Sequence, residues 1–361
     1  MPADMTDTAV TVSIAELRDF VIATLRQTGL GEADSATTAD ALVEADSLGV
    51  FTHGTKLLVG YLRKLRGGGY RPDATPRIER EGPSWAVIDG ESGLGQVGGV
   101  FAIHTALAKA RQTGMAYVGL RNTGHIGAAG YYATLAARQG MIALVTGNDM
   151  PSVAAPGSRG PVLGSNPIAY GIPRGSDDPI LLDIATAAVA GGKVYAAHQR
   201  GEPIPATWLI GKDGRPTTDG SLYPYQASLA PMAGHKGYGF GLWCELLSAV
   251  LPGGHLTWQV GSWMFDEPTR PSWHNASFTV WNVSAMTSEE AWLSRLKHLV
   301  DEIHAAPTAD GIDRVLLPGE REWANHRRAS EQGIPLPADV VAKLKTIAEE
   351  TGLHPAWLQN H

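Results

Sequence analysis

Cysteine, clustered positive charge and long apolar runs are all scarce in this sequence. The 361 residues include one cysteine, Cys244, which has no partner for an internal disulfide and therefore points to a reducing compartment. The formal net charge is -7 and no block of lysine or arginine stands out, so we expect neither a nucleic-acid nor a membrane partner. The apolar stretch around Cys244 is interrupted by Glu245 and falls short of the about 20 residues that a membrane-spanning helix requires.

Several short motifs of well-known chemistry are also missing. The start of the chain, Met1–Asp7, is polar and acidic and lacks the segments of a secretory leader, so we expect a soluble cytoplasmic protein. No G-x-S-x-G elbow is present, which argues against a serine hydrolase. No HExxH or CxxC spacing is present either, and we predict no metal site. A ligand set can be composed only from distant positions: His53, His125, Asp183 and His235.

Glycine, by contrast, is abundant in a composition that is otherwise ordinary for a globular protein. The chain has 43 glycines, which predicts many tight turns and close backbone approaches. Hydrophobic residues make up 43% of it, which excludes wholesale disorder. Its length exceeds one ordinary core and suits two or three lobes.

The two ends of the chain show the apolar periodicity of helices. Ser13 followed by Glu16 has the pattern of a capping box, and Gly29 is a natural stop for the helix that begins there. The predicted terminal helices span residues 13–29, 33–47, 55–66, 288–305 and 338–351.

The middle of the chain is mixed. Short strands alternate with helices from residue 85 to about residue 145, and residues 151–231 are rich in glycine and proline without helical periodicity. Phe278–Val283 alternates apolar and polar residues like an exposed strand. We therefore expect a mixed α/β fold with these domains: a helical one from residues 1–83 plus 300–361, and a mixed one from residues 84–299.

Residues 93–98 form a literal G-x-G-x-x-G that follows a predicted strand and precedes a predicted helix. A Rossmann dinucleotide turn has this form, but it expects an acidic residue about 20 positions further on to hold the ribose. Leu120, Arg121 and Asn122 stand there instead, and the alternation of strand and helix fades after residue 145. We interpret the motif as a tight strand-to-helix connection.

Two histidines lie in motifs that suit proton transfer or anion binding. Thr52, His53 and Gly54 separate two predicted helices, and an imidazole with an ordinary pKa of about 6.5 beside a hydroxyl is a candidate acid–base group. A surface or capping histidine is the simpler alternative there. Residues 121–130 lead from a strand into a helix of small residues, so backbone N–H groups near His125 could receive a phosphate or a flat ring. A plain helix cap would have the same sequence.

Three further segments are candidates for ligand contacts. Asp183 ends an apolar strand, where it could orient a histidine, bind a ribose hydroxyl or simply begin a turn. His235 and Lys236 precede a predicted helix, which combines a cation with a helix N-terminus and suits a phosphate. The turn at residues 318–320 has little specificity by itself.

Taken in order, these motifs resemble the malate/L-lactate dehydrogenase family that lacks a Rossmann fold. This family includes sulfolactate and ureidoglycolate dehydrogenases, diketogulonate reductase and piperideine-carboxylate reductase. The resemblance covers about residues 13–335. It is carried by THG at 52–54, DGxxGxGQ at 89–96, NTGHIGAAGYY at 122–132, GSNPIAYGIP at 164–173, DIAT at 183–186, GHKGYG at 234–239 and PGE at 318–320.

The resemblance implies an NAD- or NADP-dependent oxidoreductase of a small 2-oxo or 2-hydroxy acid. It implies a homodimer with the active site near the subunit interface, and a non-Rossmann cofactor domain on a mixed, largely antiparallel sheet. His53 is the implied proton donor with help from Thr52, His125 is the other candidate, and Asp183 is the fourth implied catalytic residue. The implied substrate positions are Lys56, Leu57 and Tyr61. The implied cofactor positions are His125, Ile126, Gly127, Ala128, Ala129, Asn148, Asp149, Asp183, Ile184, Ala185, His235, Lys236, Pro318, Gly319 and Glu320.

The chain also departs from the family pattern. Leu57 stands where relatives generally carry an arginine that grips the substrate carboxylate, and a neighbouring residue such as Lys56 points about 100° away on a helix. Asp149 stands where relatives often have serine or threonine, and a carboxylate near a 2′-phosphate would disfavour NADP. Three alternatives stay open: hydride transfer to a 2-oxo acid, reduction of a cyclic ketimine such as a piperideine- or pyrroline-carboxylate, and dinucleotide binding without catalysis.

Overall fold

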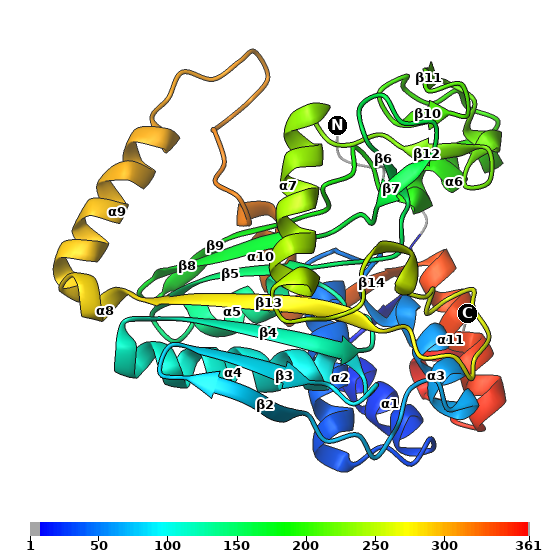
Figure 1. Cartoon of the computed structure of the whole chain (residues 1–361), viewed down its shortest axis with the longest axis horizontal. Coiled ribbons are helices and arrows are strands. Elements are labelled where there is room, and N and C mark those ends of the chain that lie inside the picture. The colour runs from blue at the N-terminus through cyan, green and yellow to red at the C-terminus, as the bar shows by residue number, and fades with distance from the viewer. Residues whose placement is uncertain (1–7, 360–361) are drawn as a thin grey trace.

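A seven-stranded mixed sheet forms the centre of the computed structural model, which describes residues 8–359 (Figure 1). Within this sheet β3 and β4 run parallel, and every other neighbouring pair is antiparallel. This arrangement confirms the predicted non-Rossmann fold on a mixed sheet, since a Rossmann sheet is mostly parallel. The strands, in spatial order, are β2 (Arg77–Gly82), β3 (Trp85–Asp89), β4 (Met115–Thr123), β13 (His274–Asn282), β5 (Met141–Gly147), β8 (Ile168–Arg174) and β9 (Asp177–Ile184).

Helices cover both faces of this sheet. On one face pack α4 (Gly95–Thr113) and α5 (Ala129–Ala137), whose buried side chains are mostly alanines. Across the other face runs α7 (His235–Glu245), which continues into the π-helical turn η3 (Leu246–Val250). The backbone of η3 is hydrogen-bonded to the sheet, because Tyr117 Oη, on β4, donates to the Leu247 carbonyl at 2.6 Å.

The central position of β13 corrects one expectation. Its alternating sequence predicted an exposed strand, but β13 lies between β4 and β5, with Phe278 and Val280 fully buried. The side chains that alternate with these apolar residues along β13 are half-buried or buried, because η3 covers the face of the sheet to which they point. Ser277, for example, hydrogen-bonds Thr146 at 2.7 Å inside the protein.

The glycines at 93–98 connect β3 to α4, as interpreted from the sequence. A Cβ on Gly95 would lie 2.3 Å from the His125 carbonyl oxygen, and one on Gly98 would meet Thr123 Oγ1 at 3.0 Å. Glycine is therefore needed here for close packing of α4 under the turn that follows β4.

A helical body formed by both chain ends packs beside the sheet, as the sequence predicts (Figure 1). The ends are joined by antiparallel pairing of β1 (Thr8–Val12) with β14 (Ile334–Pro337). The expected capping box is present, because Ser13 Oγ accepts the Glu16 N–H at 3.2 Å and Glu16 Oε2 accepts the Ser13 N–H at 3.4 Å. The helices are α1 (Ile14–Arg26), α2 (Glu32–Ser47), η1 (Thr55–Leu57), α3 (Leu58–Gly67), α10 (Glu320–Gln332), α11 (Ala338–Thr351) and α12 (Ala356–Gln359).

A small third lobe, upper right in Figure 1, contains a five-stranded sheet and α6 (Gly191–Gln199). This helix corrects the expectation that residues 151–231 contain none. It begins with two glycines and buries only Val194 and Ala197, so its apolar pattern is too short to stand out. The other elements of the lobe are β11 (Pro216–Thr217), β10 (Leu209–Gly211), β12 (Ala227–Leu229), β6 (Val153–Ala154), β7 (Pro161–Leu163) and η2 (Gly220–Leu222).

Helix α9 (Glu289–His304), predicted from its periodicity, extends away from the sheet at the left of Figure 1. It follows the short α8 (Val283–Met286), and η4 (Thr257–Gln259) lies in the long connection before β13. No helix among residues 8–359 is both long and apolar enough to cross a membrane. The acidic start of the chain, where no leader is expected, lies outside the described residues. The domain division at residues 83 and 299 stays a prediction.

Candidate active site

Three imidazoles meet where the sheet adjoins the helical body. His53 lies in the turn between α2 and η1, His125 follows β4, and His274 begins β13. The ring centroid of His125 is 6.0 Å from that of His53 and 5.6 Å from that of His274. The antiparallel pairing of β13 with β4 places His274 opposite Thr123, which is two residues before His125. The fold therefore brings the two predicted histidines together and adds a third.

Hydrogen bonds fix the tautomer of His125. Its Nδ1 accepts the Gly127 N–H at 3.3 Å and the Tyr61 hydroxyl at 2.9 Å, and Tyr61 in turn accepts from Gln96 Nε2 at 3.1 Å. The ring proton is therefore on Nε2. Burial, reinforced by His274 and His53, lowers the pKa of His125 to about 3. His125 is thus neutral at ordinary pH and presents an N–H donor.

His53 lies in a different electrostatic environment. Thr52 Oγ1 is 3.0 Å from its Nδ1, as the adjacent hydroxyl in the sequence suggested. Burial lowers the pKa of His53, but the carboxylates of Asp183 and Asp149 act in the opposite direction. Two carboxylates therefore favour the proton on His53, whereas His125 has Asp149 alone acting in that direction and two imidazoles acting against it.

Asp183 lies at the end of β9 and accepts the Gly130 N–H, from the first turn of α5, at 2.7 Å. Its side chain is partly open to solvent, but the surrounding protein removes part of the water from the carboxyl group, and this burial raises the pKa of Asp183. The Gly130 hydrogen bond and the nearby His53 act against that rise. Asp183 thus links the end of β9 to the start of α5 and lies within electrostatic reach of His53.

A second hydrogen-bonded chain, which no sequence motif indicated, runs from His125 to Asp149. The backbone N–H of His125 donates to Tyr70 Oη at 3.1 Å. Tyr70 is fully buried, and the acceptor within reach of its own proton among residues 8–359 is Ser272 Oγ, 2.9 Å away. Ser272 then donates to His274 Nδ1 at 2.9 Å. His274 Nε2–H therefore donates to Asp149 Oδ1 at 3.1 Å.

Trp263 is also part of the site and was not predicted. Its ring stacks on His125 with centroids 4.9 Å apart and lies 5.0 Å from the ring of Tyr61. A Cβ on Gly60 would lie 2.2 Å from the Trp263 ring, so only glycine at position 60 leaves room for the indole. Trp263 comes from the long connection between η3 and β13, where no spacing pattern singles it out.

Asp46, on α2, holds the turn that carries His53 through hydrogen bonds to Thr55. Asp46 Oδ2 accepts the Thr55 N–H at 2.9 Å and the Thr55 hydroxyl at 2.6 Å. Its Oδ1 is buried with no hydrogen-bond partner in the part of the chain that the structure describes, and it faces Gly54, where a Cβ would lie 1.7 Å away. Burial raises the pKa of Asp46 to about 7 against the Thr55 hydrogen bonds.

Two of the three predicted substrate positions, Lys56 and Leu57, have their contacts away from the imidazoles. The Lys56 ammonium pairs with Asp339 on α11 at 2.5 Å. Leu57 is buried in the core of the helical body. Tyr61 alone among the three predicted substrate positions contacts a predicted catalytic residue.

The predicted cofactor positions that follow β4 and β5 lie on the segments that carry His125 and Asp149. Ile126 is buried, Ala128 is the N-cap of α5, and Ala129 is its first residue. Asn148 is buried and bridges β13 to the connection before η4, since its Oδ1 accepts the Asn275 N–H at 2.9 Å and its Nδ2 donates to the His255 carbonyl at 3.0 Å. Asp149, next along the chain, contacts His274, and the sequence did not predict this contact.

The remaining cofactor positions lie further out. Ile184 ends β9 and Ala185 follows it, and the carbonyl of Pro318 accepts the Leu181 N–H of the same strand at 3.1 Å. Gly319 has a φ of 92° and is the N-cap of α10, and the first residue of this helix is Glu320, whose Oε2 accepts the Leu317 N–H at 2.9 Å. His235 and Lys236 are exposed in the first turn of α7, and Lys236 lines a hollow of about 280 Å³ with Phe240 and Trp243.

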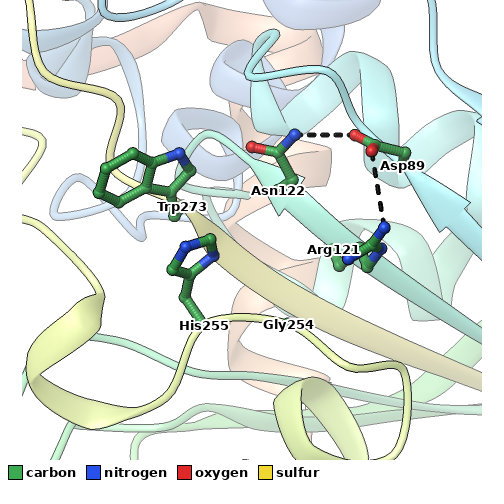
Figure 2. A pocket seen from close by; sticks show the side chains of 6 residues that line it. All are labelled: Asp89, Arg121, Asn122, Gly254, His255 and Trp273. Atoms are coloured by element: carbon green, nitrogen blue, oxygen red, sulfur yellow. Dashed lines mark hydrogen bonds and ion pairs between the residues drawn. The ribbon is translucent and has the colours of Figure 1, made fainter.

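A separate cavity of about 400 Å³ lies behind the start of β13 (Figure 2). Trp273 and His255 form one wall as stacked rings 4.8 Å apart, and Asn122 Nδ2 donates to Asp89 Oδ1 on the other side at 2.9 Å. None of the predicted site residues lines it. Among residues 8–359, no three or more His, Cys, Asp or Glu side chains, the three imidazoles included, are arranged so that they could hold a metal ion.

Comparisons with known proteins agree with this geometry. A family model described as malate/L-lactate dehydrogenase matches residues 12–345. The chain belongs to the malate/L-lactate dehydrogenase family. A malate dehydrogenase of Pyrococcus abyssi is 36% identical over 345 residues, covering 94% of each chain. A pyrroline-2-carboxylate/piperideine-2-carboxylate reductase of Pseudomonas putida is 31% identical, covering 96% of this chain and 99% of its own.

Solved structures support the same assignment. The sulfolactate dehydrogenase of Methanocaldococcus jannaschii superposes with a TM-score of 0.88 at 34% identity, covering 95% of this chain and 98% of that one. Membership of the malate/L-lactate dehydrogenase family confirms the predicted resemblance, the oxidoreductase class and a nicotinamide cofactor, with the choice between NAD and NADP left open.

Proposed function

We propose that this chain transfers a hydride reversibly between a nicotinamide cofactor and the carbonyl carbon of a small 2-oxo acid, whose reduced form is the 2-hydroxy acid. The observation that carries the proposal is the pairing of unlike imidazoles. His53 faces two carboxylates, and His125 is locked as a neutral N–H donor. One group can exchange a proton while the other polarises a carbonyl.

The chain's own residues fit a nicotinamide dinucleotide. Small residues begin α5, so a ligand can approach the backbone there, and Asp183 is exposed beside that helix start. Lys236 lies in the first turn of α7, so its ammonium group and the N-terminus of this helix can both bind a phosphate. When bound, the nicotinamide supplies or accepts the hydride. We assign the cofactor contacts to Ile126–Ala129, Asn148, Asp149, Asp183–Ala185, His235, Lys236 and the turn at 318–320.

In this proposal His53 is the acid–base group. During reduction the carbonyl oxygen gains negative charge and takes a proton from His53 Nε2, while the hydroxyl of Thr52 stays on Nδ1. His125 donates a hydrogen bond from Nε2 to the same oxygen and keeps its proton, because its pKa lies far below neutrality. Since burial lowers the pKa of His53, we expect hydroxy-acid oxidation to need no more than neutral pH for a deprotonated base.

The test follows the absorbance of NADH and NADPH separately with 2-oxo acids, sugar-derived keto acids and cyclic imines. We expect His53→Ala to reduce turnover by about 10²–10⁴-fold with cofactor affinity retained, as for loss of a general acid. His125→Ala is expected to reduce turnover less, and without moving the pH profile. Near-normal turnover in both variants would contradict the assignment.

A cyclic-imine reductase is the second candidate, and one observation favours it. No described hydrogen bond or ion pair of the three imidazoles, Asp149 or Asp183 involves lysine or arginine, and Leu57 is buried. A protonated imine brings its own proton and positive charge to such a site. Loss of His53 should then impair imine reduction much less than ketone reduction, which separates the two candidates.

We further propose that the protein is a homodimer and that it works in the cytoplasm. The support for a dimer is an apolar stripe on α7 and η3 that is about half-exposed in the single chain. Its members are Phe240, Leu242, Trp243, Leu246, Val250 and Leu251. A contiguous apolar surface of this kind is typical of an interface. The support for the cytoplasm is Cys244, which is buried as a free thiol.

A further inference from the structure

Asp149 presents one carboxylate oxygen that the protein leaves available. Oδ1 accepts two hydrogen bonds, from His274 Nε2–H at 3.1 Å and from the Met150 N–H at 2.7 Å. Oδ2 has no hydrogen-bond partner among residues 8–359, and the side chain is 29% exposed. Because both nitrogens of His274 are engaged, the carboxylate is held in one orientation with Oδ2 open to a ligand.

Among residues 8–359, the ion-pair partner of this carboxylate is the imidazole of His274, and no lysine or arginine pairs with it. Burial opposes ionisation of Asp149, but the hydrogen bonds from His274 and from the Met150 N–H, with the nearby imidazoles, hold its pKa below the ordinary value. A partly buried carboxylate of this kind favours a ligand that carries positive charge or N–H donors.

Aromatic side chains lie beside this carboxylate. Trp263 stacks on His125 at 4.9 Å with an interplanar angle of 22°, and His125 in turn is T-shaped to His274. The negative charge of Asp149 at this side of the site therefore suits a ring that carries positive charge and an N–H donor. The oxidised nicotinamide ring, with its carboxamide, is such a group, and the reduced ring has lost the charge.

We propose that Asp149, positioned by His274, binds the oxidised nicotinamide ring in preference to the reduced ring. This inference rests on the proposed function, because it requires the nicotinamide to lie beside the imidazoles. A protonated cyclic imine shares the same chemistry, so the experiment includes an arm that distinguishes this substrate from the cofactor.

The test is calorimetric titration of the full chain with the oxidised and reduced forms of whichever dinucleotide it binds. For Asp149→Asn we expect the oxidised form to bind about tenfold more weakly and the reduced form to change less than about twofold, as loss of one charge contact predicts. His274→Asn should move the ratio in the same direction by a smaller factor, since it leaves the charge but frees the carboxylate. Asp73→Asn, which neutralises an exposed carboxylate paired with Arg71, should leave the ratio unchanged.

The ratio of the two affinities separates this role from a structural one. Equal weakening of both forms in Asp149→Asn, or an unchanged ratio in both Asp149→Asn and His274→Asn, would overturn the inference. The same holds if the ratio stays constant while the complex with reduced cofactor loses affinity for a cyclic imine, since the carboxylate would then serve the substrate. If the unsubstituted chain binds neither form, the proposed function fails first.

Discussion

At the scale of single residues, the site depends on which nitrogen of each imidazole carries the proton. Tyr61 determines this for His125, since it accepts from Gln96 and passes its own proton toward Nδ1. A hydroxyl that is fully buried and bonded on both sides has one stable orientation. The neighbouring Trp263 restricts the same ring by stacking.

Tyr61→Phe tests this role of the hydroxyl. The variant keeps the ring that packs on Trp263 but removes the donor to His125, so we expect turnover to fall about tenfold or more while cofactor affinity stays within about twofold. We expect stability to fall by about 1 kcal/mol, because Gln96 loses a buried acceptor. Steady-state kinetics and urea unfolding measure the two effects. An unchanged turnover would mean that Gly127 alone fixes the tautomer.

The sequence could predict the site residues that sit in local motifs. Thr52 with His53, the turn around His125 and Asp183 each stand beside glycines or a strand end, and all of them meet in the structure. Trp263 and His274 could not be predicted, because their roles come from contacts with residues more than a hundred positions away. A single sequence carries no periodicity or spacing for such pairs.

At the scale of elements, the turn between α2 and η1 is the least tolerant part of the site. Gly54 is required because Asp46 lies directly beneath it, and the two hydrogen bonds to Thr55 hold the first turn of η1. His53 therefore takes its position from a buried acid on the preceding helix. The acid has its own effect on stability.

The folded state raises the pKa of Asp46 from an ordinary 3.8 to about 7. The folded chain then binds more protons than the unfolded chain between these values, so the free energy of unfolding should decrease as pH rises from about 4 to about 7, by on the order of 4 kcal/mol, and level off above. Asp46→Asn should remove this decrease. Urea unfolding over that pH range measures it, with Asp40→Asn on the same helix as the control.

Asp40 is suited to that comparison because it is partly exposed and paired with Arg18. Its neutralisation should leave the decrease with pH in place. An equal slope in Asp46→Asn and in the unsubstituted chain would show that another group causes the dependence.

Elements were predicted where their apolar period is long. Helices α1, α9 and α11 combine amphipathic periodicity with capping residues or charged ends, and the sequence placed each of them within a few residues. Helix α6 and strand β2 were not predicted. Strand β2 is edge-paired and largely exposed, with a polar sequence, so its identity comes from pairing with β3 rather than from its own residues.

At the scale of the whole molecule, the fold explains why the family needs no Rossmann turn. His53 comes from the helical body, His125 follows β4 and His274 begins β13, while Asp183 lies on β9 and Asp149 two residues after β5. The ends of β4, β5 and β9 and the start of β13 lie at the same side of the mixed sheet. The order of strands could not be predicted, because β13 inserts between β4 and β5 from more than 120 residues away in the sequence.

The apolar stripe on α7 and η3 crosses the outer face of this assembly, and it gives the last prediction. Trp243 is 49% exposed in the middle of the stripe, so Trp243→Glu places a charge where we propose that a second copy packs. We expect the unsubstituted chain to sediment as a dimer and Trp243→Glu as a monomer, since desolvating an unpaired carboxylate costs more than a typical interface contact contributes.

Trp85→Glu is the matched control, because Trp85 is 42% exposed on β3 and is not part of the stripe. This variant should remain a dimer. A dimer in both variants would place the interface elsewhere, and a monomer in the unsubstituted chain would remove the proposal. Because the site is proposed to lie near the interface, we expect turnover of Trp243→Glu to rise with protein concentration as dimers re-form, whereas turnover per chain of Trp85→Glu should be independent of concentration.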